Sequence, residues 1–238
     1  MRLDKLIEHH LKTTRKEQKR LFLMKKVSVD GQIELNPQRN VDSQLHKIQV
    51  AGKNLTTQQV YYLLNKPAGV VTAKKDSTFQ TVTELIAATD RPADLYPVGR
   101  LDRDTTGLLL LTDNGQLGYD LLQPTAKVSK TYQAIVNEQV TEKDVAAFAA
   151  GITFHGGVRC QPAQLQILQA KPGESNVLLT INEGKFHQVK KMFLACGKKV
   201  TSLKRLSMGP LILPPELAEG EYRSLTLAEL QQLKVYFR

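Results

Sequence analysis

A run of four leucines, residues 108–111, follows a short charged segment in the stretch VGRLDRDTTGLLLLTDNG, residues 98–115. A continuous apolar run of this length is typical of a strand buried in a core. Directly before it stand two arginines and two aspartates: Arg100, Asp102, Arg103 and Asp104. The chain must hold these charged side chains where a buried strand begins, which predicts a site at the edge of a sheet.

The 238 residues suffice for one large domain, or for a small domain joined to a medium-sized one. A hydrophobic content of 41% with 24% charged residues predicts a globular chain. No apolar run approaches the roughly 18–20 residues of a membrane span, and the first ten residues lack the apolar region of a signal peptide. We therefore expect a cytoplasmic protein that does not contact a membrane.

The two cysteines, Cys160 and Cys196, lack the spacing of a zinc site or of a disulfide framework. We expect both thiols to be buried and unreactive. No metal-binding or nucleotide-binding motif is visible in the sequence. The sequence thus predicts neither a metal nor a cofactor.

The net charge of +10 favours a polyanionic partner, of which nucleic acid is the commonest. The excess is uneven, because residues 1–58 hold twelve Lys and Arg against six Asp and Glu. Between Glu183 and Glu216 there are seven Lys and Arg and no acid. Two basic clusters indicate nucleic-acid binding more strongly than a diffuse excess would.

Two helices are predicted near the N-terminus. The first follows from apolar residues at helical spacing, Leu3, Leu6, Ile7 and Leu11, and the second begins at the capping-box pair Thr14 and Glu17. Cations three or four positions apart line one side of this turn and helix: Lys12, Arg15, Lys16, Lys19 and Arg20. Only Glu17 interrupts them, whereas a merely solvated face usually mixes in acids, so we predict that this side binds nucleic acid.

Apolar residues alternate with other residues over 27–35, on both sides of an Asp30-Gly31 turn, which predicts a hairpin. Residues 45–53 supply another short strand. Two basic helices followed by a small sheet resemble the S4 RNA-binding domain. That resemblance implies that the RNA phosphate backbone lies along the helix carrying Arg15, Lys16, Lys19 and Arg20. We predict that residues 1–58 form this domain and that the polar residues 54–59 serve as its linker.

Residues 59–238 are predicted to form a second domain. Strand patterns occur at residues 60–73 (interrupted by Lys66 and Pro67), 130–136 and 176–184. Helical patterns occur at residues 81–88, 141–151 and 187–197. Because strands and helices do not alternate regularly, we expect an α+β fold with a mixed, largely antiparallel sheet.

The charged segment permits three interpretations. The D-x-D-x-T spacing of DRDTT is similar to that of aspartyl-phosphate phosphatases, but a magnesium cage would need several acids and Arg100 and Arg103 stand in this loop. A purely structural turn would use Thr105 and Thr106 to bond loop backbone and Gly107 for an unusual dihedral angle. In the third, the nearby cations keep Asp102 ionised and available as a nucleophile or base.

The third interpretation agrees with a family resemblance. GRLDRDTTGLLLLTDNG closely resembles the signature of the ribosomal pseudouridine synthases, G-R-L-D-x-x-T-x-G-L-L-L-L-T-x-D/N-G, and NKPAG, KTY and EGKFHQVKKMF occur in family order behind the S4-like module. With a lysine at its last position, the HQVK motif resembles that of the RsuA-type branch of this family, which acts on small-subunit (16S) ribosomal RNA. The resemblance implies an isomerase that converts uridine to pseudouridine in that RNA without a cofactor.

The resemblance also implies the roles of site residues. Asp102 is the essential carboxylate, which either attacks the substrate covalently or removes a sugar proton. Tyr132 matches the active-site tyrosine that lies against the base, and Lys190 matches the basic residue that pairs with the catalytic aspartate. Arg100 would occupy the space left in the RNA stack when the target base is flipped out.

Other side chains would support or extend this site. By the same resemblance, Arg103, Lys185 and Lys191 contact RNA. Lys66 and Pro67 match an element in which a pre-set turn supports the site, and His187 is a hydrogen-bonding neighbour of Lys190.

Two alternative functions remain open at this point. One is the same reaction on large-subunit (23S) ribosomal RNA, and the other is an RNA-binding assembly factor without activity. The presence of Asp102, Tyr132 and Lys190 together argues against the second. We expect the partner to be ribosomal RNA, within a partly assembled small subunit, and the protein to be a monomer because it must dock on a much larger particle.

Overall fold

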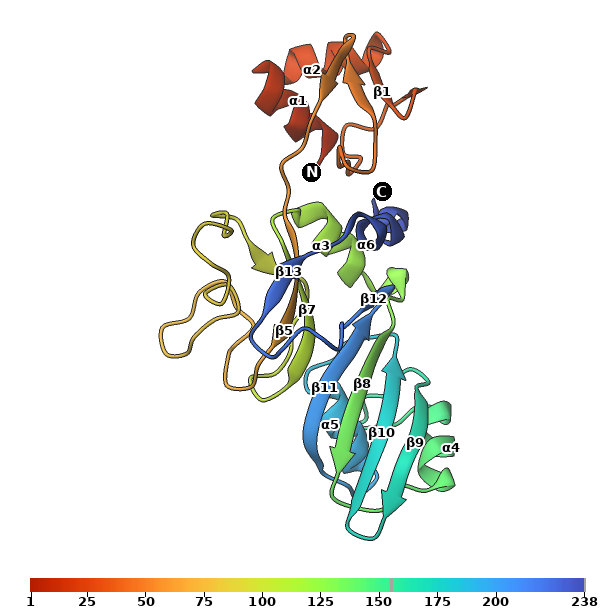
Figure 1. The fold of residues 1–238 in the computed structure, drawn as a ribbon. Helices are drawn as coiled ribbons and strands as arrows, with labels where there is room; N and C mark the ends of the chain where they lie inside the picture. The colour runs from red at the N-terminus through yellow and green to blue at the C-terminus, as the bar shows by residue number, and fades with distance from the viewer. Residues whose placement is uncertain (155, 238) are drawn as a thin grey trace.

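Two β-sheets organise the chain in the computed structural model, which describes residues 1–154 and 156–237 (Figure 1). The N-terminal part contains α1 (Leu3–Leu11), α2 (Arg15–Leu23) and a four-stranded sheet of order β2-β1-β3-β4. Its strands are β1 (Val27–Val29), β2 (Gln32–Ile33), β3 (Ile48–Val50) and β4 (Lys53–Leu55). Apolar residues of α1 and these strands, among them Leu6, Val27 and Ile48, form a separate hydrophobic cluster.

The predicted N-terminal helices are confirmed, including the capping box. The Thr14 backbone N–H donates to the Glu17 carboxylate at 2.7 Å, and the Thr14 hydroxyl accepts from the Glu17 N–H at 3.3 Å. The prediction that residues 54–59 are linker is wrong for the first two. Asn54 and Leu55 belong to β4, because Leu55 pairs with Ile48 and is buried in the N-terminal cluster.

The larger sheet has nine strands, seven of them in the order β13-β5-β7-β11-β8-β10-β9, with β6 paired to β7 and β12 paired to β11. Their bounds are β5 (Tyr61–Lys66), β6 (Tyr96–Pro97), β7 (Thr106–Thr112), β8 (Lys130–Val136), β9 (Gln164–Lys171), β10 (Glu174–Ile181), β11 (Val200–Met208), β12 (Leu211–Ile212) and β13 (Tyr222–Ser224). Strands β7 and β11 run parallel, and the other paired strands run antiparallel. The mixed sheet is therefore as predicted.

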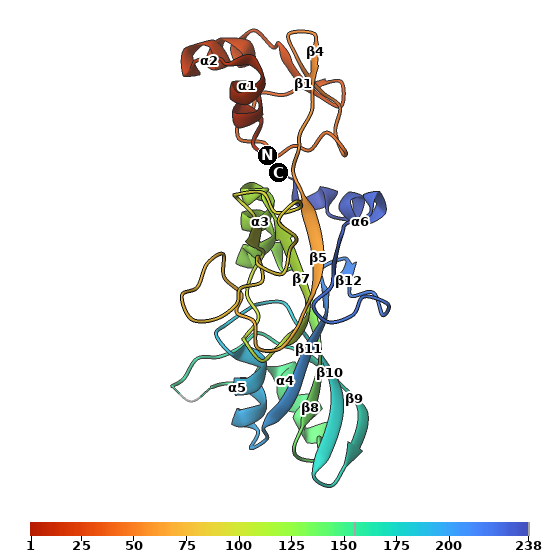
Figure 2. The ribbon, with the colours of Figure 1, turned by 60° about the vertical axis from the view of Figure 1, so that its left-hand side comes forward.

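Helices cover the larger sheet. α4 (Glu142–Ala150) and α5 (Gln188–Ala195) lie on one side of the strands β8 to β11 (Figure 2). The predicted apolar stripe of α5, with Val189, Met192 and Phe193, packs into one hydrophobic cluster of this sheet. α3 (Gly115–Leu122) and α6 (Leu227–Gln232) pack into a second cluster, next to the short 3-10 helices η1 (Pro124–Ala126) and η2 (Lys234–Tyr236). None of the described helices has the length and apolar character needed to traverse a bilayer.

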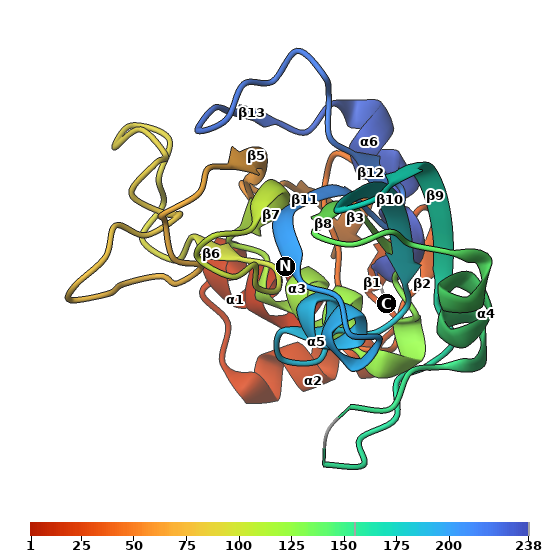
Figure 3. The same cartoon turned by 90° about the horizontal axis from the view of Figure 1, so that it is seen from below.

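The connection between β5 and β6 extends to one side of the sheet (Figure 3). The helix predicted for residues 81–88 within it is wrong, since these residues form turns. Their side chains bond to local backbone instead: the Glu84 carboxylate accepts from the Thr81 N–H at 2.7 Å, and the Thr83 hydroxyl donates to the Lys74 carbonyl at 2.9 Å. Such bonds compete with a helical ladder.

The leucine run behaves as predicted, because residues 108–111 are completely buried in β7 between β5 and β11. At its beginning, Gly107 has a φ of 101° and lies opposite Arg205 of β11. A Cβ atom on Gly107 would stand 2.3 Å from the Arg205 carbonyl oxygen. Only glycine allows β7 and β11 to approach this closely.

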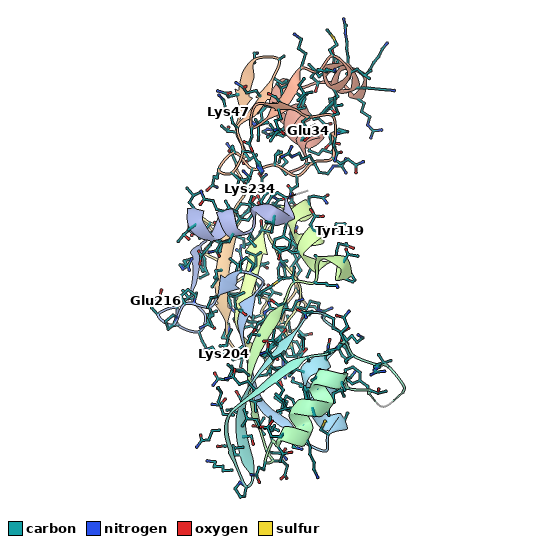
Figure 4. The ribbon with its side chains drawn as sticks, turned by 90° about the vertical axis from the view of Figure 1, so that its right-hand side faces the viewer. Glu34, Lys47, Tyr119, Lys204, Glu216 and Lys234 are labelled. Carbon is teal, nitrogen blue, oxygen red and sulfur yellow. The ribbon has the colours of Figure 1, made fainter. Side chains whose placement is uncertain are left out.

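The N-terminal part contacts the rest of the chain through polar bonds. The Tyr61 hydroxyl donates to the Asp42 carboxylate at 2.6 Å and accepts from the Asn114 amide at 3.0 Å. Lys234, which Figure 4 shows at the junction, donates to the Leu45 carbonyl at 3.1 Å. These bonds join the two sheets across the linker.

We predict that Gly107→Ala destabilises the protein by several kcal/mol, because it adds a backbone clash to the cost of an unfavourable φ. Gly173→Ala is the matched control, since Gly173 has a φ of 79° with nothing within 4 Å of the added Cβ. The control should lose roughly 1 kcal/mol. Urea unfolding monitored by circular dichroism measures both, and equal losses would contradict the close-approach argument.

Candidate active site

The charged loop before β7 holds Asp102 against the beginning of α5. The Lys190 ammonium lies 3.0 Å from Asp102 Oδ2 and 2.7 Å from Asp104 Oδ1. His187 Nε2 is 3.5 Å from Asp102 Oδ1. The Asp102 side chain is 26% exposed, so it is sheltered but open to solvent, whereas Asp104 is largely exposed. The structure thus brings together the predicted Asp102, Lys190 and His187.

One ammonium serves two carboxylates in this arrangement. Burial opposes the charge of Lys190, but its hydrogen bonds to Asp104 and Asp102 raise its pKa above the ordinary value. The hydrogen bond from Lys190 lowers the pKa of Asp104. Lys190 therefore remains charged beside Asp102, and the lysine acts as a point charge.

The buried side chain of Lys66 holds the charged loop through hydrogen bonds to its backbone. Its side chain is completely buried at the end of β5, and its ammonium donates to the carbonyls of Pro67 at 3.0 Å, Arg103 at 3.1 Å and Thr105 at 2.9 Å. Burial lowers the pKa of Lys66 to about 8. Through the Arg103 and Thr105 carbonyls, the Lys66 ammonium holds the backbone that follows Asp102 in the chain.

Thr72 holds the other side of Asp102. Its hydroxyl donates to the Leu101 carbonyl at 2.8 Å and accepts from the Leu101 N–H at 3.2 Å. The Thr72 side chain is buried, so both bonds are shielded from water. Sequence reasoning missed this residue because nothing distinguishes it from other loop threonines.

A row of residues crosses the sheet next to the loop. Lys66 of β5 and Arg205 of β11 both lie opposite Gly107, and Arg205 in turn lies opposite Tyr132 of β8. Tyr132 is buried in the hydrophobic cluster that α5 covers. The structure thus places the predicted Tyr132 two strands away from the strand that Asp102 precedes.

The second basic cluster does not form one surface, contrary to the expectation from sequence. Arg205 is 1% exposed, and its Nε donates to the Leu108 carbonyl at 2.7 Å. Lys198 lies 2.7 Å from Asp144 of α4. A count of charges cannot separate these internal cations from those that face solvent.

The remaining predicted cations lie in different surroundings. Arg100 is exposed, and the nearby Asp104 of the same loop pairs with Lys190. The Arg103 guanidinium lies 4.5 Å from the ring centre of Phe79, and Lys185 forms an ion pair with Glu183. On α2, four cations are exposed and make no ion pair with another described residue: Arg15, Lys16, Lys19 and Arg20.

Aromatic side chains next to the loop were also missed from sequence. The Arg103 guanidinium lies over the ring of Phe79, and the ring of Phe186 stacks on that of His187 with centroids 3.7 Å apart. Lys191 Nζ is 4.9 Å from the centre of the Phe186 ring. An isolated phenylalanine carries no sequence signal for such a position.

Among the described residues, no group of three or more His, Cys, Asp or Glu is placed to hold a metal ion. Cys160 is buried, which raises its pKa to about 11, and Cys196 is half-buried. The site offers a carboxylate, Asp102, whose loop is held on both sides and which is paired with a cation. Such a group can act as a nucleophile or as a general base.

The sequence matches a known protein family and several of its members. Residues 60–195 match the family described as RNA pseudouridylate synthase. An uncharacterized RNA pseudouridine synthase of Bacillus subtilis is 41% identical over 234 residues, covering 98% of both chains. Ribosomal small subunit pseudouridine synthase A of Haemophilus influenzae is 38% identical, covering 98% of this chain and 99% of the relative.

Solved structures agree with the sequence matches. A crystal structure of a pseudouridylate synthase superposes with a TM-score of 0.69 at 37% identity, covering 98% of this chain and 99% of the other. The archaeal box H/ACA Nop10–Cbf5 complex superposes with a TM-score of 0.50 at 16% identity, over 74% of this chain and 53% of the other. The second likeness shows a shared fold alone.

We predict that Lys66→Met loosens the loop around Asp102, because three carbonyls lose the ammonium that they share. The Gly69 and Thr105 amides, which donate to the Arg103 and Asp102 carbonyls, should exchange their hydrogens at least roughly tenfold faster. Hydrogen exchange resolved by NMR measures this.

Lys198→Met is the control, since it removes another shielded ammonium that pairs far along the chain with Asp144. It should leave the Gly69 and Thr105 amides unchanged. Normal exchange at both amides in Lys66→Met would show that Lys66 does not hold the loop.

Proposed function

The chain belongs to the RNA pseudouridylate synthase family, and on that basis we propose that it converts a uridine of small-subunit (16S) ribosomal RNA to pseudouridine, with Asp102 as the essential carboxylate. The observation that carries this proposal is the Asp102–Lys190 pair at 3.0 Å, on a loop fixed by Lys66. The small-subunit target is supported by relatives named ribosomal small subunit pseudouridine synthase A in Haemophilus influenzae and Escherichia coli.

The reaction needs a carboxylate and no external electron acceptor. The bond between the ribose C1′ and uracil N1 breaks, and a bond from C1′ to C5 forms. C5 loses a proton and N1 gains one, so no electrons are transferred to an external acceptor. Asp102 either attacks the substrate or removes a sugar proton, while Lys190 pairs with the carboxylate and orients it.

The surrounding side chains receive the flipped nucleotide. Tyr132 lies against the uracil, and Arg100 fills the space that it leaves in the RNA stack. Arg103, Lys185 and Lys191 contact the RNA around the site, while His187 and Pro67 support the loop. Arg100 and Arg103 are exposed, which leaves them accessible to RNA.

Residues 1–58 form an S4-type RNA-binding domain in this proposal, and residues 59–238 form the catalytic domain. The separate sheet and the separate hydrophobic cluster of the N-terminal part support the division. The partner is ribosomal RNA within a partly assembled small subunit, and the enzyme acts in the cytoplasm as a monomer without a cofactor.

Tritium release from RNA labelled at uracil C5 tests the reaction. Wild type should release tritium from small-subunit RNA or its partly assembled particle and not from large-subunit RNA. Asp102→Asn should lose activity on the order of 10³-fold or more while binding RNA normally, because the amide cannot act as a nucleophile or base. Asp94→Asn is the control and should keep turnover of the same order as wild type, since the Asp94 side chain is 90% exposed and pairs with Lys74 instead of Lys190.

Each outcome decides a part of the proposal. Substantial turnover by Asp102→Asn would remove that residue from its role. Release from large-subunit RNA alone would change the target, and RNA binding with no release from any substrate would favour the assembly-factor function.

Salt dependence tests the N-terminal footprint. Binding to RNA should weaken when four cations are replaced with Ala: Arg15, Lys16, Lys19 and Arg20. The slope of the logarithm of the association constant against the logarithm of the salt concentration should become roughly 3 less steep, because fewer counterions are released. The control replaces Lys143 of α4 and Lys171 of β9 with Ala, since these two elements lie at the opposite end of the molecule from α2 (Figure 1), and it should leave the slope unchanged. An unchanged slope in the quadruple variant would place the RNA elsewhere.

A further inference from the structure

An exposed aromatic ring, Phe186, is separated from the Asp102 carboxylate by one side chain, His187. Phe186 is 73% exposed, and the imidazole of the adjacent His187 reaches to 3.5 Å from Asp102. Isolated apolar side chains on a surface are common and need no explanation. Phe186 differs from them because its ring is held in a fixed position.

Backbone and side-chain contacts both fix the ring. His187 has a φ of 53°, a left-handed conformation that non-glycine residues adopt at a cost. Successive side chains of an extended strand point to opposite faces, but here the two rings stack with an interplanar angle of 22°. The strained residue therefore keeps Phe186 and His187 together at the beginning of α5.

A cation adds to the order of this pair. Lys191 Nζ lies 4.9 Å from the centre of the Phe186 ring and 5.8 Å from that of Phe154. The ammonium thus bridges an exposed ring and a buried one, which ties Phe186 to the core. Most of Phe186 nevertheless remains uncovered, so a flat ligand can reach it.

A pre-ordered aromatic ring beside a cation suits a nucleotide. Bases of unpaired RNA stack on aromatic side chains, while lysines follow the phosphates. Arg100 fills the gap that the target base leaves, but an adjoining nucleotide of an unpaired segment still presents a base face to the protein. A ring that is one side chain away from the Asp102 carboxylate lies close enough to stack on that face.

We propose that Phe186 stacks on the base of the nucleotide adjoining the target uridine, with Lys191 on a neighbouring phosphate. This subsite rests on the proposed function. Its ligand is any nucleobase of a single-stranded segment, because stacking does not distinguish base edges. Phe186 is thus a positioning residue for the target uridine.

Kinetics of tritium release test the subsite on an oligoribonucleotide that contains the uridine modified by wild type. Phe186→Ala should raise KM by roughly 5-fold to 100-fold, the loss expected for one base stacked on an aromatic ring, and Phe186→Trp should restore it. Leu194→Ala is the control, because Leu194 is 58% exposed on the helix that Phe186 precedes. It should leave KM unchanged.

An RNA without the neighbouring base makes the test specific. Oligonucleotides with an abasic residue on the 5′ or the 3′ side of the uridine should bind wild type more weakly. For one of them, Phe186→Ala should add no further penalty, since the stacking partner is already absent. Equal penalties of Phe186→Ala on intact and on both abasic RNAs would overturn the subsite.

The two proposals fail in different ways. Normal turnover by wild type with an unaltered KM in Phe186→Ala would overturn the subsite and leave the proposed function in place. Wild type that releases no tritium from any RNA would overturn the proposed function, and the subsite with it.

Discussion

The buried ammonium of Lys66 is the interaction on which the geometry of the site depends. Removing an ammonium from water costs several kcal/mol, and its charge-assisted hydrogen bonds to three carbonyls offset that cost. The consequence is geometric, because one donor at the end of β5 fixes the backbone of Arg103 and Thr105 at the beginning of β7. With Thr72 holding Leu101, Asp102 is anchored on both sides while its carboxylate stays open to solvent.

The partner of that carboxylate comes from a different part of the fold. Lys190 stands on α5, whose apolar stripe packs against the sheet on the side that also buries Tyr132. Asp104 binds the same ammonium at 2.7 Å, so Lys190 keeps one anionic partner even when a substrate approaches Asp102. The close approach of β7 to β11 at Gly107 keeps the loop and this face of the sheet in register.

Local patterns were enough to predict part of this structure. Periodicity and capping spacing predicted α2, the buried strand β7 and the stripe of α5, because each depends on residues close in sequence. The turns at residues 81–88 are held by side-chain bonds to nearby backbone, which apolar spacing does not reveal. The interior place of Arg205 depends on a contact with a distant segment, which a local pattern does not contain. The same is true of Thr72 and Phe186, since their roles follow from where Leu101 and His187 are in space.

The junction between the two sheets bears on how RNA is selected. The buried bond from Tyr61 to Asp42, at 2.6 Å, and the bond from Lys234 to Leu45 hold the N-terminal part against the larger sheet. The exposed cations of α2 therefore stand at a set distance from the charged loop. In the proposed function, RNA bound to α2 can bring to Asp102 only a uridine whose place in the folded RNA matches that distance. Two sites on one rigid body raise the effective concentration of a matching RNA and exclude others. Selection then follows from RNA shape, without base contacts on α2.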